Sequence, residues 1–257
     1  MNTGKNGIPA SASIIAHNEA RRIGKCLGSL KDFNEVVIVI DSKTDDATES
    51  IAREFGCKIY REDWQGFGPQ KQSAINKCSN DWVLIIDADE VLPVETAKEI
   101  AKTLENKKPR ADAYAFPRKN FFHGKWLRHG DSWPDWQTRL VNRKKGFFTS
   151  VIHEKWDTRG PLVKIHTPIE HFCFEKYADM LETMDRYSSI IAADLFSKGV
   201  RANTFTPLFH AFWMFTRVYI VKRGFLDGFN GLATSFLKAG GSFFKYAKLL
   251  ELQGQKK

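Results

Sequence analysis

Over the first 118 residues, short runs of apolar, β-branched residues alternate with amphipathic segments. Continuous apolar runs predict strands that are buried on both faces, and apolar residues at helical spacing predict helices between them. This alternation is typical of an α/β fold with a mostly parallel sheet and helices on both faces. Strands are expected at residues 11–16, 35–40, 57–60, 82–86 and 113–117, and helices at residues 19–30, 46–55, 70–77 and 94–104.

The pattern changes after residue 118. Residues 119–174 have weak periodicity and many Trp, Arg, Lys, His and Gly residues, which is typical of functional loops around a few strands. From residue 175 the spacing predicts a C-terminal helical segment, with helices at 177–197, 207–222 and 229–252. We therefore expect an α/β half at 1–118, acceptor and catalytic loops at 119–174 and a helical extension at 175–257.

The formal net charge of +9 is unevenly distributed along the 257 residues. Residues 1–100 carry 12 basic and 16 acidic side chains, whereas residues 201–257 carry 9 basic and 2 acidic ones. A basic C-terminal region indicates an anionic partner. With 42% hydrophobic and 27% charged residues, a wholly disordered or collagen-like chain is excluded.

The four cysteines form no C-x-x-C pair, which fits a reducing compartment and argues against a zinc ribbon or a disulfide scaffold. The first residues lack the apolar core of a signal peptide. The most apolar stretch, residues 205–221, is interrupted by His210 and Arg217, and a spanning helix needs roughly 20 apolar residues. A cytoplasmic protein without transmembrane spans is expected.

The D-A-D-E segment at residues 87–90 directly follows a predicted buried strand. Alternate residues of an extended segment point the same way, so Asp87 and Asp89 are expected to present carboxylates to one spot. Two such oxygen ligands suit Mg²⁺ or Mn²⁺ shared with substrate phosphates. The alternative is an acidic turn in which Glu90 begins the next helix.

Two further strand ends are polar. Asp41 and the Ser, Thr and Asp residues after it follow the second strand, and His17-Asn18-Glu19 follow the first. Ligands of open α/β sheets bind beyond the carboxyl ends of the strands. The three strand ends are therefore expected to converge on one polar cleft, in which Asp41 accepts hydrogen bonds from a base or a ribose; the alternative is that these side chains only cap helices.

The order of these motifs resembles the nucleotide-sugar half of family 2 glycosyltransferases. The motifs are A-H-N-E, V-I-D-S-K-T-D-D-A-T, D-W-Q-G-F-G-P-Q-K-Q and D-A-D-E. With R-K-N-F-F-H-G-K-W-L-R-H-G, P-D-W-Q-T-R-L and G-F-L-D-G, the chain is similar over residues 11–252 to bacterial lipopolysaccharide core β-1,4-glucosyltransferases, which add glucose to an inner-core heptose. Lys43 departs from the family pattern, which usually has glycine at this position.

The resemblance implies a GT-A fold, a Rossmann-like sheet that holds a nucleoside diphosphate sugar through Mg²⁺ or Mn²⁺. It implies that Asp41 contacts the uracil, that Asp87 lies near the ribose, and that Asp89 binds the metal and the diphosphate. The other residues expected to contact the donor are His17, Asn18, Glu19, Lys71, Gln137 and Arg139.

The resemblance also places a general base at Asp135, in P-D-W-Q-T-R-L. An inverting transfer needs one carboxylate that deprotonates the attacking hydroxyl, and the neighbouring Trp residues are expected to desolvate this one. The alternative is a solvated aspartate paired with Arg139. Glu154 is the rival base, and His153 is expected to be a third metal ligand, a phosphate contact or a structural residue.

Aromatic and basic residues alternate in the C-terminal region. Phe205, Phe209, Phe212, Trp213 and Phe215 are followed by Lys222-Arg223, and Phe243, Phe244 and Tyr246 alternate with Lys245 and Lys248. This mixture is typical of helices that lie on an anionic membrane; the alternative is packing on the α/β domain or on another subunit. No nucleic-acid-binding module is present in the sequence, so nucleic acid is not an expected partner.

Together these features predict an inverting, metal-dependent glycosyltransferase at the cytoplasmic face of the inner membrane. The expected donor is UDP-glucose, and the expected acceptor is a lipid-linked saccharide such as the lipopolysaccharide inner-core heptose. The alternatives are transfer to another cell-surface glycan and a non-catalytic nucleotide-sugar-binding module.

Overall fold

A computed structural model describes residues 7–105, 111–148, 155–174 and 176–254. The chain forms two compact units. The α/β unit comprises Met1–Arg118 and Trp136–His171, and the helical unit comprises Lys119–Asp135 and Phe172–Lys257. Of the segment 119–174, residues 119–135 and 172–174 lie in the helical unit, and residues 136–171 lie in the α/β unit.

The predicted strands are present, and the segment after residue 118 contains further ones. The strand expected at 113–117 extends to Phe122, where it pairs with a short following strand. The strands are β1 (Ile8–Ala16), β2 (Phe33–Asp41), β3 (Lys58–Glu62), β4 (Trp82–Ile85), β5 (Glu90–Val91), β6 (Ala113–Phe122), β7 (Lys125–Trp126), β8 (Asp135–Asn142), β9 (Gly146–Phe148), β10 (Trp156–Thr158), β11 (Leu162–Lys164) and β12 (Ile169–Phe174).

The main sheet has the order β3-β2-β1-β4-β8-β6-β12-β5 in the described part of the chain, and β7 and β11 pair with β6. The first four strands of this order are parallel, and β8 joins β4 in the antiparallel direction. Because β2 lies on one side of β1 and β4 on the other, the strand order reverses at β1. Such a reversal is the usual ligand-binding position in an open α/β sheet.

Four helices accompany this sheet in the described residues of the α/β unit. Residues of α1, α2 and α4 pack with Ile14 and Ile38 on one face, and Ile75 of α3 packs with Val37 and Val83 on the other. Alternate residues of β2 therefore enter opposite cores, as expected for a strand buried on both faces. The predicted α/β fold with helices on both faces is confirmed. The helices are α1 (Ile23–Gly28), α2 (Thr48–Glu54), α3 (Phe67–Asn76) and α4 (Val94–Glu105).

Two of these helices differ from the predicted ones. α1 is shorter than the expected 19–30, because Asn18 has a φ of 53° and the Glu19 carbonyl accepts hydrogen bonds in a turn that precedes the helix. α3 begins at Phe67 rather than at residue 70. The residue before it, Gly66, has a φ of 101°, a conformation that favours glycine.

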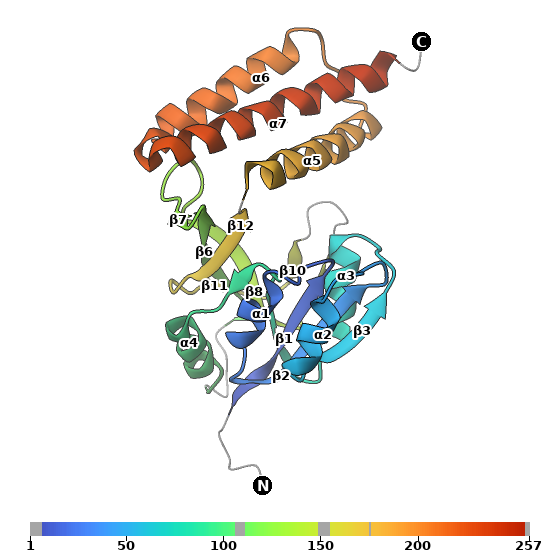
Figure 1. The fold of residues 1–257 in the computed structure, drawn as a ribbon, viewed down its shortest axis with the longest axis vertical. Coiled ribbons are helices and arrows are strands. Elements are labelled where there is room, and N and C mark those ends of the chain that lie inside the picture. The colour runs from blue at the N-terminus through green and yellow to red at the C-terminus, as the bar shows by residue number, and fades with distance from the viewer. Residues whose placement is uncertain (1–6, 106–110, 149–154, 175, 255–257) are drawn as a thin grey trace. The chain divides into compact units, whose positions relative to one another are not determined.

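The predicted C-terminal helical segment is confirmed. α7 packs against both α5 and α6 (Figure 1). The helix expected at 207–222 is α6 followed by a π-helix. Gly231 lets the start of α7 lie close to the carbonyl of Gly224, because a Cβ at position 231 would lie 1.8 Å from that oxygen. No helix among the described residues has the length and apolar character that crossing a bilayer requires. The helices are α5 (Tyr177–Ser197), α6 (Thr206–Phe215), the π-helix η1 (Thr216–Val221), the 3₁₀ helix η2 (Gly224–Asp227) and α7 (Gly228–Gly254).

Candidate active site

The loops after β1 and β2 are joined by side-chain contacts at the edge of the sheet where the strand order reverses. His17 Nδ1 lies 3.5 Å from the carboxylate of Asp41, which is buried, and the Asp41 carboxylate accepts a hydrogen bond from the Lys43 backbone N–H at 3.0 Å. The side chain of Asn18 accepts a hydrogen bond from the Asp45 N–H at 3.1 Å. The structure thus places His17 beside Asp41 and joins Asn18 to Asp45 in the loop after β2.

Arg22 connects the loop after β1 with the loop after β4. Its guanidinium lies 3.0 Å from the Glu19 carboxylate and 3.7 Å from that of Asp89. Burial raises the pKa of the Glu19 carboxyl to about 7; the charge of Arg22 opposes this rise, and that of Asp89 adds to it. The third polar strand end therefore meets the other two, and part of the acidic charge here is balanced by a cation.

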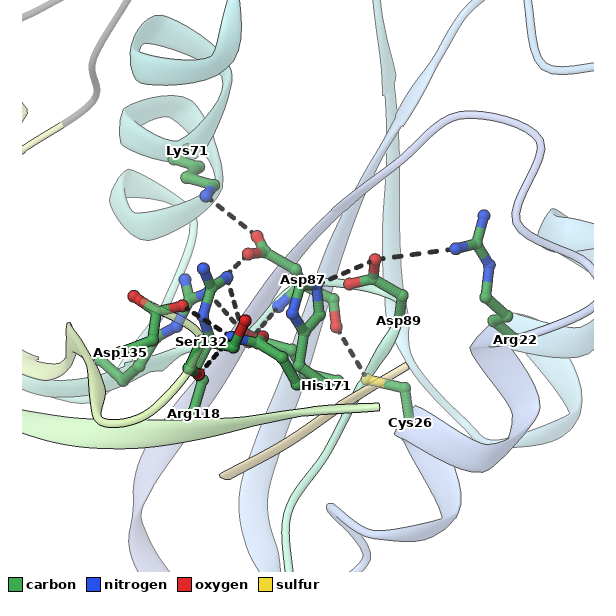
Figure 2. Close-up of polar contacts among 12 residues, drawn as sticks. Arg22, Cys26, Lys71, Asp87, Asp89, Arg118, Ser132, Asp135 and His171 are labelled. Carbon is green, nitrogen blue, oxygen red and sulfur yellow. Dashed lines mark hydrogen bonds and ion pairs between the residues drawn. The ribbon is translucent and has the colours of Figure 1, made fainter. Parts of the chain in front are cut away.

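The D-A-D-E segment is a turn and not an extended strand, so the prediction that Asp87 and Asp89 share one direction is wrong. The Glu90 N–H donates to the Asp87 carbonyl at 2.9 Å, and the Glu90 carboxylate accepts from the Asp87 N–H at 3.0 Å. Glu90 also does not begin a helix, since it lies in β5. As a result the two aspartates contact different partners (Figure 2).

Asp87 is held by two buried cations. Its carboxylate lies 2.9 Å from Nζ of Lys71 in α3 and 2.5 Å from the guanidinium of Arg139 in β8. The same guanidinium contacts Glu90 at 2.5 Å, and Arg118 lies 3.4 Å from that glutamate. Burial raises the pKa of Asp87, but the charges of Arg139 and Lys71 outweigh it and hold this pKa well below its usual value. Asp87 is therefore an anion that is fixed in place.

Arg139 and Lys71, both predicted donor contacts, thus lie in the interior of the site. Arg139 is 4% exposed and Lys71 is 6% exposed. Burial lowers the pKa of Arg139, but Asp87 and Glu90 more than compensate and raise it above its usual value. A guanidinium buried between two carboxylates positions them.

Asp89 lies beside a histidine that the sequence analysis did not single out. Nε2 of His171, in β12, lies 3.3 Å from the Asp89 carboxylate (Figure 2). Within the described residues no group of three or more His, Cys, Asp or Glu side chains is arranged as a metal cage. Mg²⁺ and Mn²⁺ in phosphate-transfer sites commonly use one or two protein ligands and complete their shell with substrate phosphates. Asp89 and His171 fit that donor set; His153 lies outside the described residues.

The predicted base, Asp135, belongs to the helical unit and is the first residue of β8. The side-chain amide of Asn120 donates to the Asp135 carboxylate at 3.3 Å and to the Ser132 carbonyl at 3.0 Å. Gln137 follows two residues later in the strand, so it occupies the same face as Asp135. Asn120 thus orients the Asp135 carboxylate. The rival base, Glu154, lies outside the described residues.

With this geometry established, comparisons with known proteins identify the family. A family model for glycosyl transferase family 2 matches residues 11–157, more than half of the chain. The chain belongs to glycosyl transferase family 2. It is therefore an enzyme, and the predicted resemblance is confirmed.

Relatives of this glycosyltransferase cover nearly its whole length. An uncharacterized glycosyltransferase of Rickettsia felis is 31% identical over 94% of this chain and 89% of its own. The lipopolysaccharide core biosynthesis glycosyltransferase LpsC of Rhizobium meliloti is 26% identical over 93% of this chain and 94% of its own. Among solved structures, glucosyl-3-phosphoglycerate synthase from Mycobacterium tuberculosis, crystallised with Mg²⁺ and UDP, is 16% identical, with a TM-score of 0.48 over 77% of this chain and 82% of that one.

The sequence did not single out several residues of the candidate site. Arg118 and Asn120 lie inside the R-K-N-F-F-H motif, which carried the family resemblance but no assigned side-chain role. His171 follows a Pro-Ile-Glu segment far from every polar strand end that the pattern singled out. Arg22 lies in a segment that was expected to be plain helix. Only the motif around Arg118 offered a signal that sequence reasoning could have used.

Proposed function

We propose that this family 2 glycosyltransferase transfers glucose from UDP-glucose, with inversion, onto a lipid-linked saccharide such as the lipopolysaccharide inner-core heptose. The observation that carries the proposal is the convergence of the loops after β1, β2 and β4 at the reversal point of the sheet. There Arg22 links Glu19 to Asp89, and His17 lies beside Asp41. Such a polar edge is where an open α/β sheet binds a nucleotide.

The donor site follows from these contacts. Asp41 is buried, and the backbone N–H of Lys43 donates a hydrogen bond that orients its carboxylate. Asp41 is therefore suited to accept hydrogen bonds from the uracil. His17 and Asn18 are assigned to the same donor site. Asp87, whose position is fixed by Lys71 and Arg139, is assigned to the ribose. Gln137 is the further polar contact on β8.

The divalent cation, Mg²⁺ or Mn²⁺, is assigned to Asp89 and His171. A nitrogen donor beside a carboxylate favours Mn²⁺, since Mg²⁺ strongly prefers oxygen ligands. When bound, such a cation neutralises the charge that develops on the departing diphosphate. Arg22, 3.7 Å from Asp89, adds a positive charge at the same place.

The chemistry is a single displacement. The acceptor hydroxyl attacks the anomeric carbon of the donor glucose, the bond from that carbon to the diphosphate oxygen breaks, and UDP leaves. Asp135 takes the proton of the attacking hydroxyl, a step that requires a carboxylate in line with the leaving group. Asn120 holds the Asp135 carboxylate in one orientation.

The acceptor class is supported by LpsC, which is named for lipopolysaccharide core biosynthesis and matches this chain along nearly all of its length. A lipid-linked acceptor places the enzyme at the cytoplasmic face of the inner membrane, in peripheral contact with anionic lipid. Transfer to another lipid-linked cell-surface glycan would use the same donor site and the same base.

The test is a transfer assay on the full chain with UDP-glucose, UDP-galactose and UDP-N-acetylglucosamine, each with Mn²⁺, Mg²⁺ or a chelator. The acceptor is deacylated inner-core oligosaccharide, and the product anomer is determined by nuclear magnetic resonance. We expect metal-dependent transfer of glucose with inversion. Transfer from another donor, or retention of configuration, would overturn the corresponding part of the proposal.

A further inference from the structure

Helix α6 turns its apolar face to solvent. Its exposed side chains are spaced i, i+3, i+4, i+7 and i+8, the spacing of an apolar stripe that in a globular protein usually faces the core. The opposite face, with Pro207 buried, packs toward α7. α6 therefore exposes the apolar stripe that a helix of a globular protein usually buries. The exposed residues are Phe205 (76% exposed), Leu208 (60%), Phe209 (68%), Phe212 (71%) and Trp213 (53%).

The exposed apolar residues continue beyond α6. The end of η1, the helix η2 and the start of α7 add five large side chains, each about half exposed or more. We call this set and the stripe on α6 together the apolar patch. An apolar patch of this extent on a soluble protein marks an interaction site. The five added residues are Ile220, Val221, Phe225, Leu226 and Phe229.

The charge around the apolar patch is mostly positive; Asp131, in the same unit, pairs with Arg217 at 2.9 Å and with Lys222 at 3.6 Å. Between Asp194 and Glu251 the sequence has a single acidic residue, Asp227. Its side chain is 8% exposed and lies 2.9 Å from His129, so it adds little negative charge to the surface. The same stretch contains eight Lys and Arg residues, of which Arg201, Lys222 and Arg223 are exposed at the ends of α6 and η1.

We propose that the apolar patch docks on an anionic lipid bilayer. The rings would lie at the boundary between headgroups and acyl chains, and Arg201 and Arg223 would lie among the anionic headgroups. A second copy of the chain is a poorer occupant, because pairing through this face would oppose two basic surfaces. Only the purpose of docking rests on the proposed function, since docking would bring the enzyme to a lipid-linked acceptor.

Two members of the second aromatic and basic segment, Tyr246 and Lys248, pack inside the helical unit. Tyr246 stacks on His210 with ring centroids 4.2 Å apart, and Lys248 donates hydrogen bonds to Asp185 and Ser188 in α5. These side chains pack the helices together, so the alternative of internal packing holds for them. The docking surface is assigned to the apolar patch on α6, η1, η2 and the first residues of α7; further along α7, Phe236 (60% exposed) and Phe244 (45%) are also exposed.

The experiment is co-sedimentation of the full chain with vesicles of phosphatidylcholine alone and of phosphatidylcholine with phosphatidylglycerol. We expect binding to the anionic vesicles that weakens as salt is added. Phe209→Ser with Phe212→Ser should weaken it about a hundredfold, if each ring contributes roughly tenfold. Arg201→Gln with Arg223→Gln should weaken it roughly 30-fold, and only for anionic vesicles.

Matched controls separate docking from general surface effects. Phe147, 58% exposed on β9 of the α/β unit, is the control for the aromatic pair as Phe147→Ser. Exposed Lys25 and Lys98 of the same unit are the controls for the basic pair as Lys25→Gln with Lys98→Gln. All the substituted side chains are exposed, so the variants are expected to fold, which circular dichroism verifies. Control variants should bind vesicles like the parent chain.

Two results would overturn the proposal. One is equal binding of the parent chain and the Phe209→Ser, Phe212→Ser variant to anionic vesicles. The other is a parent chain that is dimeric by light scattering and a variant that is monomeric, since a second copy would then cover the patch. Transfer from UDP-glucose to a deacylated acceptor is measured on the same variants; it should be unchanged, so a failure of docking and a failure of the proposed function give different results.

Discussion

The imidazole Nδ1 of His129 lies 2.9 Å from Oδ1 of Asp227, and the His129 backbone N–H donates to Oδ2 of the same carboxylate at 2.8 Å. The next residue, Gly130, donates its N–H to the carbonyl of Lys222 and accepts a hydrogen bond from Nζ of Lys238. The loop that leads into the proposed base is therefore fastened to η2 and to both helices that flank it. Besides its proposed docking surface, the helical unit thus supplies contacts that fix the position of this loop.

Removing the Asp227 carboxylate should reduce turnover without affecting the donor site. In Asp227→Ala the loop loses both of its bonds to η2, and an error of about 1 Å in a reacting group can lower a rate by roughly a hundredfold. We expect kcat to fall at least about tenfold, while the Kd for UDP, measured by calorimetry, stays the same. Asp194→Ala, which removes an aspartate paired with Lys198 in the same unit, is the control. Unchanged kcat in Asp227→Ala would show that the loop needs no such support.

Asp135→Asn tests the base itself. The amide keeps the size of the side chain and cannot accept the hydroxyl proton, so transfer should fall about 10²- to 10⁴-fold. Binding of UDP should persist, because no donor contact is assigned to Asp135. The measurement is single-turnover transfer alongside calorimetric titration with UDP.

Glu154→Gln is the companion variant, since Glu154 is the rival base. A loss of transfer in Glu154→Gln together with full activity in Asp135→Asn would exchange the two assignments. A loss in both would indicate that one carboxylate removes the proton and the other binds the acceptor, and the effect of acceptor concentration on the rate would then separate these roles.

Local pattern was sufficient to predict the α/β half and the C-terminal helices. The runs at residues 36–40 of β2 and 82–85 of β4 are apolar at successive positions, because both faces of these strands are covered. Helix α5 was predicted with the bounds that it has, Tyr177–Ser197, since its apolar spacing is regular over its whole length. Where each residue of a segment meets the same kind of environment, the sequence alone identifies the element.

The conformation of the D-A-D-E segment depends on distant residues, and for that reason the local pattern was misleading. Asp87 turns toward Arg139, which is 52 residues away, and Asp89 lies beside His171, which is 82 residues away along the sequence. The alternation of side-chain directions along a strand carries no information about which distant residues will contact Asp87 and Asp89. The same holds for Arg22. The local pattern predicts an exposed helix position for it, but its side chain lies between Glu19 and Asp89, at the ends of two strands.

The assignment of the cation to Asp89 and His171 predicts a metal-specific defect. His171→Ala removes one of two protein ligands, so the tightening of UDP binding by Mn²⁺ should fall about 10- to 100-fold, and Asp89→Asn should act in the same direction. Binding measured with a chelator present should be unchanged in His171→Ala. His166→Ala, at a histidine whose ring contacts Trp136, is the control. If Mn²⁺ still tightens UDP binding in His171→Ala as in the parent chain, His171 is not a ligand.

Glu35 lies at the opposite end of β2 from the candidate site and makes stability depend on pH. Its carboxylate accepts hydrogen bonds from Lys58 at 2.6 Å, from the Ser79 N–H at 2.7 Å and from the hydroxyl of Ser11. Burial of Glu35 raises its pKa, but these donors outweigh burial and lower the pKa to about 2, from 4.5. A carboxyl with a lowered pKa stabilises the fold above its unfolded pKa, and this contribution is lost as the pH falls toward the folded one.

Glu35→Gln should therefore destabilise the α/β unit at neutral pH and make no difference at low pH. The lowering of the Glu35 pKa from 4.5 to about 2 corresponds to about 2 kcal/mol in the free energy of unfolding, once it is reduced for the solvent exposure of Lys58. Urea denaturation of the parent and variant should show that difference above pH 4.5, shrinking toward zero as the pH approaches 2. Glu54→Gln, at an exposed residue of α2, is the control and should give a constant, small difference. A Glu35→Gln effect that does not change between neutral and acidic pH would mean that packing, and not the charge of Glu35, stabilises this end of the sheet.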